Sequence, residues 1–202
     1  MGAVAVVAAL AGVFVARMLN QPAIPSLESG TSLPQARVLP EFNLVDTHGA
    51  PAPTAALRGH PTLVFFGFTH CPDVCPTTLA TLASVQKQVV SDKKLAGLKI
   101  ALISVDPERD TPQQLGSYIA SFGGDFIGLT GSADEIVKAS RGFGVAAARV
   151  DLGGGNYTMD HSAAVFALDS QARIVAVFSP PFSAPALARD VARLAPVLNP
   201  HI

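Results

Sequence analysis

The sequence is poor in charge and in cysteine, and its basic residues do not cluster. Only 14% of the 202 residues are charged, and the formal net charge is -1. A domain that binds nucleic acid is expected to carry a clustered basic face, so nucleic acid is not a predicted partner. No internal repeat is present, and the length favours one well-packed domain with additions over two domains.

The N-terminal region also lacks charge. Residues 2–16 contain no polar side chain, a length between a signal-peptide core and a membrane span. No Lys or Arg precedes them, so charge does not give an orientation, and the Ala-x-Ala at 9–11 lies inside the apolar run rather than after it. We predict a membrane anchor or uncleaved signal over residues 1–19, with a buried N-terminal helix as the alternative.

The rest of the chain divides into a linker and a domain. Residues 20–40 are rich in Pro, Ser and Gly and are predicted to form a flexible linker, and residues 41–202 are predicted to fold. Apolar runs predict strands at 42–45, 63–68, 99–105, 146–150, 163–168 and 174–178. Helices are predicted at 76–90 and from Thr111, Ser132 and Ser183, with Ser132 and Glu135 as a capping box. This order favours an α/β sandwich with a mixed central sheet.

The whole cysteine complement is Cys71 and Cys75, placed where a strand gives way to a helix. A structural disulfide is a poor explanation, because so short a loop contributes only about 2 kcal/mol of stability. A thiol at a helix N-terminus is expected to have a depressed pKa, since the helix dipole favours the thiolate that attacks disulfides or binds metal. We therefore interpret the pair as functional.

The CxxxC spacing differs from the CxxC of disulfide oxidoreductases and places both sulfurs on one side of a helical turn. Two thiolates select copper(I) or zinc, and one added imidazole makes a set that holds copper in either common oxidation state. His161 is the candidate third ligand, because it precedes a predicted strand and follows the glycines at 153–155. That glycine run predicts a flexible loop able to move the histidine on and off the metal.

Other candidate residues have simpler explanations. His70, beside Cys71, could be a ligand, but neighbours on an extended segment point to opposite faces. Met159 offers a thioether, and packing is the preferred role for it. Residues 106–112, DPERDTP, are predicted to form a charged loop with local ion pairs rather than a metal or acid–base site. Solvated or structural roles are expected for the remaining histidines, His48, His60 and His201.

Three strings together resemble the Sco/SenC family of copper proteins: FGFTHCPDVCP at 66–76, DPERDTP at 106–112 and DHS at 160–162. The resemblance covers residues 41–196. It implies a thioredoxin-like fold with an N-terminal membrane anchor, and copper(I) or copper(II) bound by Cys71, Cys75 and His161. It also implies a role in assembling the dinuclear copper (CuA) centre of cytochrome c oxidase, by delivering copper, by reducing the target's cysteines, or both.

Two functions therefore stay open. The first is a copper metallochaperone, and the second is a thiol-disulfide oxidoreductase whose redox pair, Cys71 and Cys75, reduces the oxidase subunit or another exported partner. A peroxiredoxin-like peroxidase is not favoured, because neither cysteine follows the P-x-x-x-T-x-x pattern. The expected partners are the copper-binding subunit of the oxidase, other periplasmic copper chaperones and thioredoxin-like reductants. The expected location is the bacterial inner membrane, with the domain in the periplasm.

Overall fold

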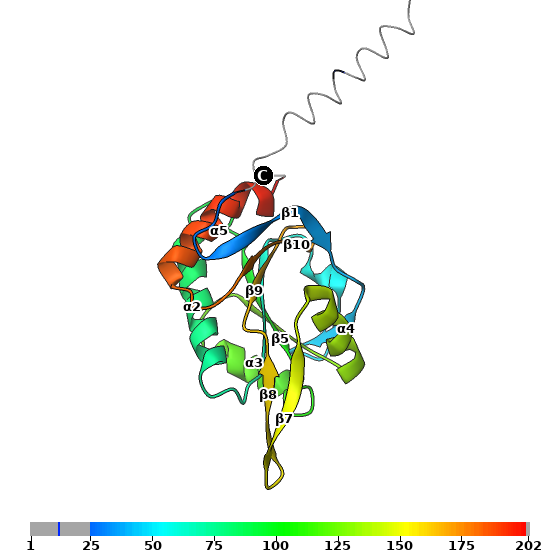
Figure 1. The fold of residues 1–202 in the computed structure, drawn as a ribbon. Helices are drawn as coiled ribbons and strands as arrows, with labels where there is room; N and C mark the ends of the chain where they lie inside the picture. The colour runs from blue at the N-terminus through cyan, green and yellow to red at the C-terminus, as the bar shows by residue number, and fades with distance from the viewer. Residues whose placement is uncertain (1–11, 13–24, 201–202) are drawn as a thin grey trace, which may run out of the picture.

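A computed structural model describes residue 12 and residues 25–200, and Figure 1 shows their arrangement. The strands are β1 (Gly30–Val38), β2 (Asn43–Asp46), β3 (Pro51–Pro53), β4 (Thr62–Gly67), β5 (Lys99–Ser104), β6 (Phe126–Thr130), β7 (Ala147–Gly153), β8 (Asn156–His161), β9 (Val165–Leu168) and β10 (Arg173–Phe178). The helices are the 3-10 helix η1 (Thr54–Leu57) and α2 (Val74–Val89), α3 (Pro112–Ala120), α4 (Ala133–Phe143) and α5 (Ala184–Leu198).

One eight-stranded sheet organises the domain, in the order β1-β10-β9-β4-β5-β6-β2-β3. The central strands β4, β5 and β6 pair in parallel. Every other pair of neighbouring strands in the sheet is antiparallel: β1–β10, β10–β9 and β9–β4 on one side, and β6–β2 and β2–β3 on the other. Every residue of β4 is buried, as expected for a parallel strand that is covered on both faces. The predicted mixed central sheet is confirmed.

Helices cover both faces of this sheet. Phe66 of β4 packs edge-on against Phe143 of α4, with 5.1 Å between ring centroids. On its neighbour Gly67, an added Cβ would lie 3.0 Å from the Sγ of Cys75 in α2. Successive residues of a strand face opposite sides, so α2 and α4 lie on opposite faces, and α5 packs beside α2 (Figure 1). The predicted α/β sandwich is therefore confirmed.

Three helices begin at the predicted hydroxyl residues. The side chains of Thr111, Ser132 and Ser183 each accept a hydrogen bond from the backbone N–H three residues later. The second half of the predicted capping box is wrong, because the Glu135 carboxylate does not bond back to Ser132. It accepts instead from the backbone N–H of Asn43, 2.6 Å away, and so joins α4 to β2.

The predicted linker is wrong for residues 30–38, which form the edge strand β1. This strand pairs with β10 from Gly30, opposite Phe178, and its register breaks between Ser32 and Arg37, around Pro34. An edge strand tolerates proline because one row of its backbone N–H groups pairs with nothing. The proline and glycine content that indicated a linker is therefore compatible with a strand here.

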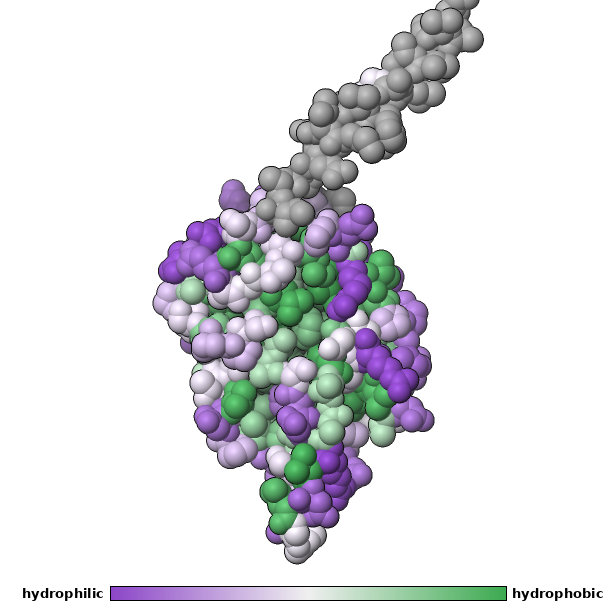
Figure 2. Space-filling model, in the orientation of Figure 1, coloured by the Kyte–Doolittle hydropathy of each residue, from purple (hydrophilic) through white to green (hydrophobic). Residues whose placement is uncertain are grey.

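A second correction concerns the predicted flexible loop before His161. The glycines at 153–155 all have positive φ and form the turn of a two-stranded antiparallel hairpin, β7–β8. Among the described residues, its strands pair only with each other. Three left-handed residues in a row are accessible at low cost only to glycine, so the run builds a defined turn. The hairpin projects from the domain in Figure 1, and Figure 2 shows hydrophobic and hydrophilic side chains together on this projection. Val150 and Leu152 are exposed on the hairpin.

The predicted anchor over residues 1–19 lies, except for residue 12, outside the described residues. In the part of the chain that the structure describes, none of the helices has the length and apolar character needed to cross a membrane.

Candidate metal centre

The two cysteines lie at the N-terminus of α2. Cys75 is in the first helical turn, and Cys71 is in the segment that joins β4 to the helix. The first N–H groups of a helix have no partner within it, and the N-cap residue Asp73 supplies no side-chain bond. Cys71 fills this role, because its Sγ accepts from the backbone N–H of Cys75 at 3.4 Å. The sulfurs are thus held together by helix capping, not by sharing one helical turn as predicted.

The two thiols have different surroundings. Cys75 is fully buried and Cys71 is half-buried. Burial raises the pKa of the Cys75 thiol, and a hydrogen bond with the backbone of Phe68 only partly opposes this. The predicted depression of the pKa is therefore wrong for Cys75, because loss of solvent outweighs the helix dipole. A metal that binds this sulfur must displace its proton.

His161 reaches the same place from the end of β8. Its Nε2 lies 3.7 Å from the Sγ of Cys75, and its ring packs edge-on against Phe65 and Phe68. Its Nδ1 lies 3.2 Å from the carbonyl oxygen of Ser162. A carbonyl only accepts, so Nδ1 carries the proton and the Nε2 lone pair faces the thiol. Burial lowers the pKa of His161, with the Ser162 bond opposing, so the neutral, metal-binding form is favoured.

The structure thus gathers the three predicted site residues, from two elements that are far apart in sequence. The ligand atoms of these three residues do not all lie within 4.8 Å of one another. In the described residues, three potential ligand atoms lie within 4.8 Å of one another only in the group of His70, Asp106 and Asp110. Cys71 and His161 each approach Cys75, so a bound ion would have to draw their ligand atoms closer together.

The His70 group is already occupied by internal contacts. Asp110 accepts from the N–H of Thr69 at 3.1 Å and from the hydroxyls of Thr69 and Ser104, both at 2.6 Å. The Nδ1 of His70 lies 3.0 Å from the Thr69 hydroxyl. These bonds hold the segment before Cys71 in place, which gives His70 and Asp110 a structural role.

Sequence reasoning missed most of what residues 106–110 do. The predicted local ion pair is present, between Asp106 and Arg109. Asp106 also accepts a hydrogen bond from the hydroxyl of Tyr157 in β8, at 2.8 Å. The available signal was that two aspartates follow a continuous apolar strand, where a buried carboxylate needs several donors.

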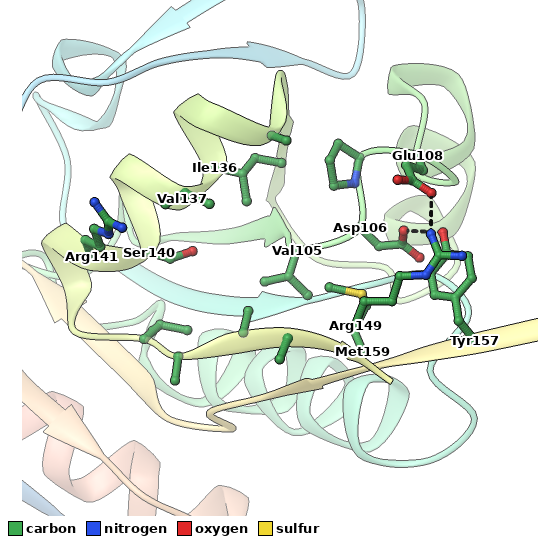
Figure 3. Close-up of a pocket in the computed structure, with 16 residues that line it drawn as sticks. Val105, Asp106, Glu108, Ile136, Val137, Ser140, Arg141, Arg149, Tyr157 and Met159 are labelled. Atoms are coloured by element: carbon green, nitrogen blue, oxygen red, sulfur yellow. Dashed lines mark hydrogen bonds and ion pairs between the residues drawn. The ribbon is translucent and has the colours of Figure 1, made fainter. Parts of the chain in front are cut away.

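The remaining candidates lie elsewhere. His60 bonds to Thr62 at the start of β4, the end remote from the cysteines, and burial lowers its pKa. His48 is exposed in the turn after β2, and His201 is outside the described residues. Met159 lines a cavity of ≈ 460 Å³ between α4 and the hairpin, together with Ser140 and Tyr157 (Figure 3).

The absence of a side chain at Gly67 leaves space for the Cys75 sulfur. A Cβ at this position would lie 2.9 Å from the Phe65 ring and 3.0 Å from the Sγ of Cys75, closer than packed atoms tolerate. Alanine at Gly67 is expected to destabilise the domain by about 1–3 kcal/mol through overpacking, and to displace the thiol. Denaturant unfolding would measure the first effect, and the rate at which a thiol reagent modifies Cys75 the second. Gly97→Ala, where the Cβ meets nothing within 4 Å, is the matched control, and equal behaviour of the two variants would refute the argument.

Comparisons with known proteins give the family and the fold. The SCO1/SenC family model matches residues 30–196. The copper-bound crystal structure of ScoI from Arabidopsis thaliana is similar at 31% identity and a TM-score of 0.73, over 77% of this chain and 96% of that one. The copper-bound structure of ScoI from Bradyrhizobium japonicum is similar at 38% identity and a TM-score of 0.69, over 77% of this chain and 98% of that one.

A third relative is the SCO2-like protein RP587 of Rickettsia prowazekii, 38% identical over 139 residues, which are 68% of this chain and 67% of that protein. The chain spans between 45% and 67% of the length of the first curated relatives that it matches. The thioredoxin-like fold implied by the three sequence strings is confirmed by the solved relatives. By the extent of the family match and by these similarities, the chain belongs to the SCO1/SenC family.

Proposed function

We propose that this chain is a copper metallochaperone that binds one copper ion through Cys71, Cys75 and His161. The observation that carries the proposal is the approach of the His161 Nε2 lone pair to within 3.7 Å of the Cys75 sulfur, next to a second thiol at 3.4 Å from the Cys75 N–H. Two solved relatives with copper bound support the choice of metal.

The donor chemistry fits copper as cargo. Thiolates are soft ligands that select copper(I), and the imidazole extends the set to copper(II). Binding replaces the thiol protons, and oxidation of the two sulfurs to a disulfide would remove both thiolates. Copper can thus be retained in the reduced protein and released when the pair is oxidised or when a partner offers better ligands.

The client that we propose is the copper-binding subunit of cytochrome c oxidase, during assembly of its CuA centre. The membership of the chain in the SCO1/SenC family supports this client. We further propose an N-terminal anchor in the bacterial inner membrane with the domain in the periplasm, where other copper chaperones and thioredoxin-like reductants are the expected partners. The apolar residues 2–16 support the anchor.

Copper titration of the reduced full chain tests the proposal. One tightly bound copper per chain is expected, lost in Cys71→Ser and in Cys75→Ser because two thiolates carry most of the copper(I) affinity. In His161→Ala, copper(I) binding should persist and the copper(II) complex should weaken. Absorbance, electron paramagnetic resonance and metal analysis measure these outcomes. Wild-type protein that takes up no stoichiometric copper would refute the proposal.

The second candidate function is thiol-disulfide exchange, and the unequal burial of the two thiols favours it. The half-buried Cys71 is accessible to a partner's disulfide, whereas Cys75 is enclosed. Attack by the Cys71 thiolate would form a mixed disulfide, and Cys75 would displace the partner's second sulfur. Two electrons and two protons then pass to the partner, and a Cys71–Cys75 disulfide remains. Undiminished reductase turnover in His161→Ala, with no copper bound by the wild type, would favour this function.

A further inference from the structure

The hairpin that carries His161 needs an anchor outside itself. β7 and β8 pair with each other and with no strand of the main sheet in the described residues. All residues of β7 are exposed. A two-stranded ribbon of this kind is marginally stable alone. The contacts that fix the direction of the hairpin therefore also decide whether the imidazole of His161 reaches the two cysteines.

Tyr157 makes that connection from the part of β8 next to the hairpin turn. Its ring lies between two guanidinium groups, with the Cζ atoms of Arg109 and Arg149 at 3.7 and 3.6 Å from the ring centroid. Its hydroxyl donates to Asp106 at 2.8 Å, and its backbone carbonyl accepts from Arg109 at 3.1 Å. Figure 3 shows Tyr157 and Arg149 beside Asp106 and Glu108.

The contacts of Tyr157 form a clamp between β8 and residues 106–110. Arg149, on β7, also pairs with Glu108 at 2.8 Å, so both strands of the hairpin are tied to this segment. The half-buried position of Tyr157 limits the competition of water with the two cation–π contacts and with the hydroxyl bond. Several cooperating contacts therefore fix the hairpin to residues 106–110.

The same segment also holds the cysteines. Asp110 binds the backbone and hydroxyl of Thr69, two residues before Cys71, and its own N–H donates to the carbonyl of Asp106 at 2.9 Å. Residues 106–110 are thus the common support of the thiol segment and of the imidazole hairpin. The charged residues of this segment are used for support and not for binding a metal.

We propose that Tyr157 is a positioning residue that holds His161 at the copper site, an inference that rests on the proposed copper function. Tyr157 and His161 lie on the same face of β8, since they are four residues apart and pair with Asp151 and Ala147 of β7. Loss of the clamp frees the hairpin to tilt. The imidazole then leaves Cys75, while the two thiols, held from α2 and Asp110, stay together.

Copper(II) binding to Tyr157 variants tests this role. Tyr157→Ala is expected to weaken copper(II) binding by about tenfold, the scale of a lost outer-shell contact, and to reduce the nitrogen hyperfine signal of the imidazole. Copper(I) binding by the thiols should persist. Tyr157→Phe keeps the ring between the guanidinium groups and loses only the bond to Asp106, so its effect should be smaller. Val150→Ala, on the opposite, exposed side of the hairpin, is the matched control.

A double-mutant cycle separates positioning from general damage. In a His161→Ala background, Tyr157→Ala should cause no further loss of copper(II) affinity, because the contacts act through one residue. An additional tenfold loss there, or wild-type copper(II) spectra in Tyr157→Ala, would overturn the inference. Thermal unfolding of each variant shows that the domain is still folded.

A metal-free measurement distinguishes this inference from the proposed function. The imidazole nitrogen signals of His161 should report one ordered ring in the wild type and an averaged environment in Tyr157→Ala. If the wild type bound no copper but this difference were present, the copper function would fail and the positioning role would stand. If the His161 signals were the same in both proteins, the positioning role would fail whatever the metal result.

Discussion

Alanine at Asp110 is expected to destabilise the domain by about 3 kcal/mol, because three hydrogen-bond donors lose a charged acceptor that lies in the interior. The carboxylate is fully buried and accepts from the backbone N–H and hydroxyl of Thr69 and from the hydroxyl of Ser104. The Ser104 hydroxyl in particular is buried, and a methyl group in place of the acid leaves it without this acceptor. The segment before Cys71 should loosen at the same time, so the thiol pair should react faster with an alkylating reagent. Urea unfolding and reaction rates measure both effects.

Asp110→Asn is the informative comparison. Its side chain has nearly the same shape and keeps one acceptor oxygen, and the serine and threonine hydroxyls can turn to accept from its amide. Asp110→Asn should therefore lose clearly less unfolding free energy than Asp110→Ala. If alanine and asparagine were both within about 0.5 kcal/mol of the wild type, the range of ordinary surface substitutions, the support role of Asp110 would be refuted.

Asparagine at Asp190 is expected to cost about 2 kcal/mol at neutral pH, and this cost should shrink in acid. Asp190, buried on α5, accepts from the N–H of Glu28 at 2.8 Å and from the N–H and hydroxyl of Ser29, both at 2.7 Å. Burial by itself would raise its pKa, but the Ser29 and Glu28 bonds and Arg193 lower it overall. A lowered carboxyl pKa stabilises the fold above the unfolded-state value of about 4. That stability is lost as the pH falls through the lower folded-state pKa.

Unfolding free energies at several pH values test whether the cost of Asp190→Asn decreases as the pH falls. The difference between the wild type and Asp190→Asn should be largest at pH 7 and should decrease toward pH 3. The exposed Asp134, in the first turn of α4, provides the control, since its replacement by asparagine should change stability by no more than about 1 kcal/mol. A difference for Asp190 that grows as the pH falls would contradict the assignment.

The fold could be read from the sequence where local signals are strong. The apolar run of β4 and the capping residues Thr111, Ser132 and Ser183 mark their elements unambiguously. The edge strand β1 could not be read, because half of its hydrogen-bonding groups face away from the sheet and its composition resembles a linker. Its place is set by pairing with β10, a contact between opposite ends of the chain that no local pattern records.

In the candidate site, the proposed ligands could be read from the sequence, whereas the residues that support them could not. Cys71 and Cys75 are marked by their scarcity and spacing, and His161 by the DHS string in its family context. Their supports depend on contacts between distant segments: Tyr157 lies 51 residues from Asp106, and Asp110 lies 41 residues from Thr69. An aspartate or tyrosine in a polar stretch has many possible partners, so sequence indicates its chemistry but not its contact.

The two outer strands of the main sheet are poor templates for a second chain. β3 is three residues long, and two of them, Pro51 and Pro53, have no N–H to donate. β1 is interrupted around Pro34 by its break in register. Short, proline-containing and irregular edges prevent the strand-to-strand addition that begins many aggregates. The main sheets of crowded copies are therefore poorly suited to joining edge to edge.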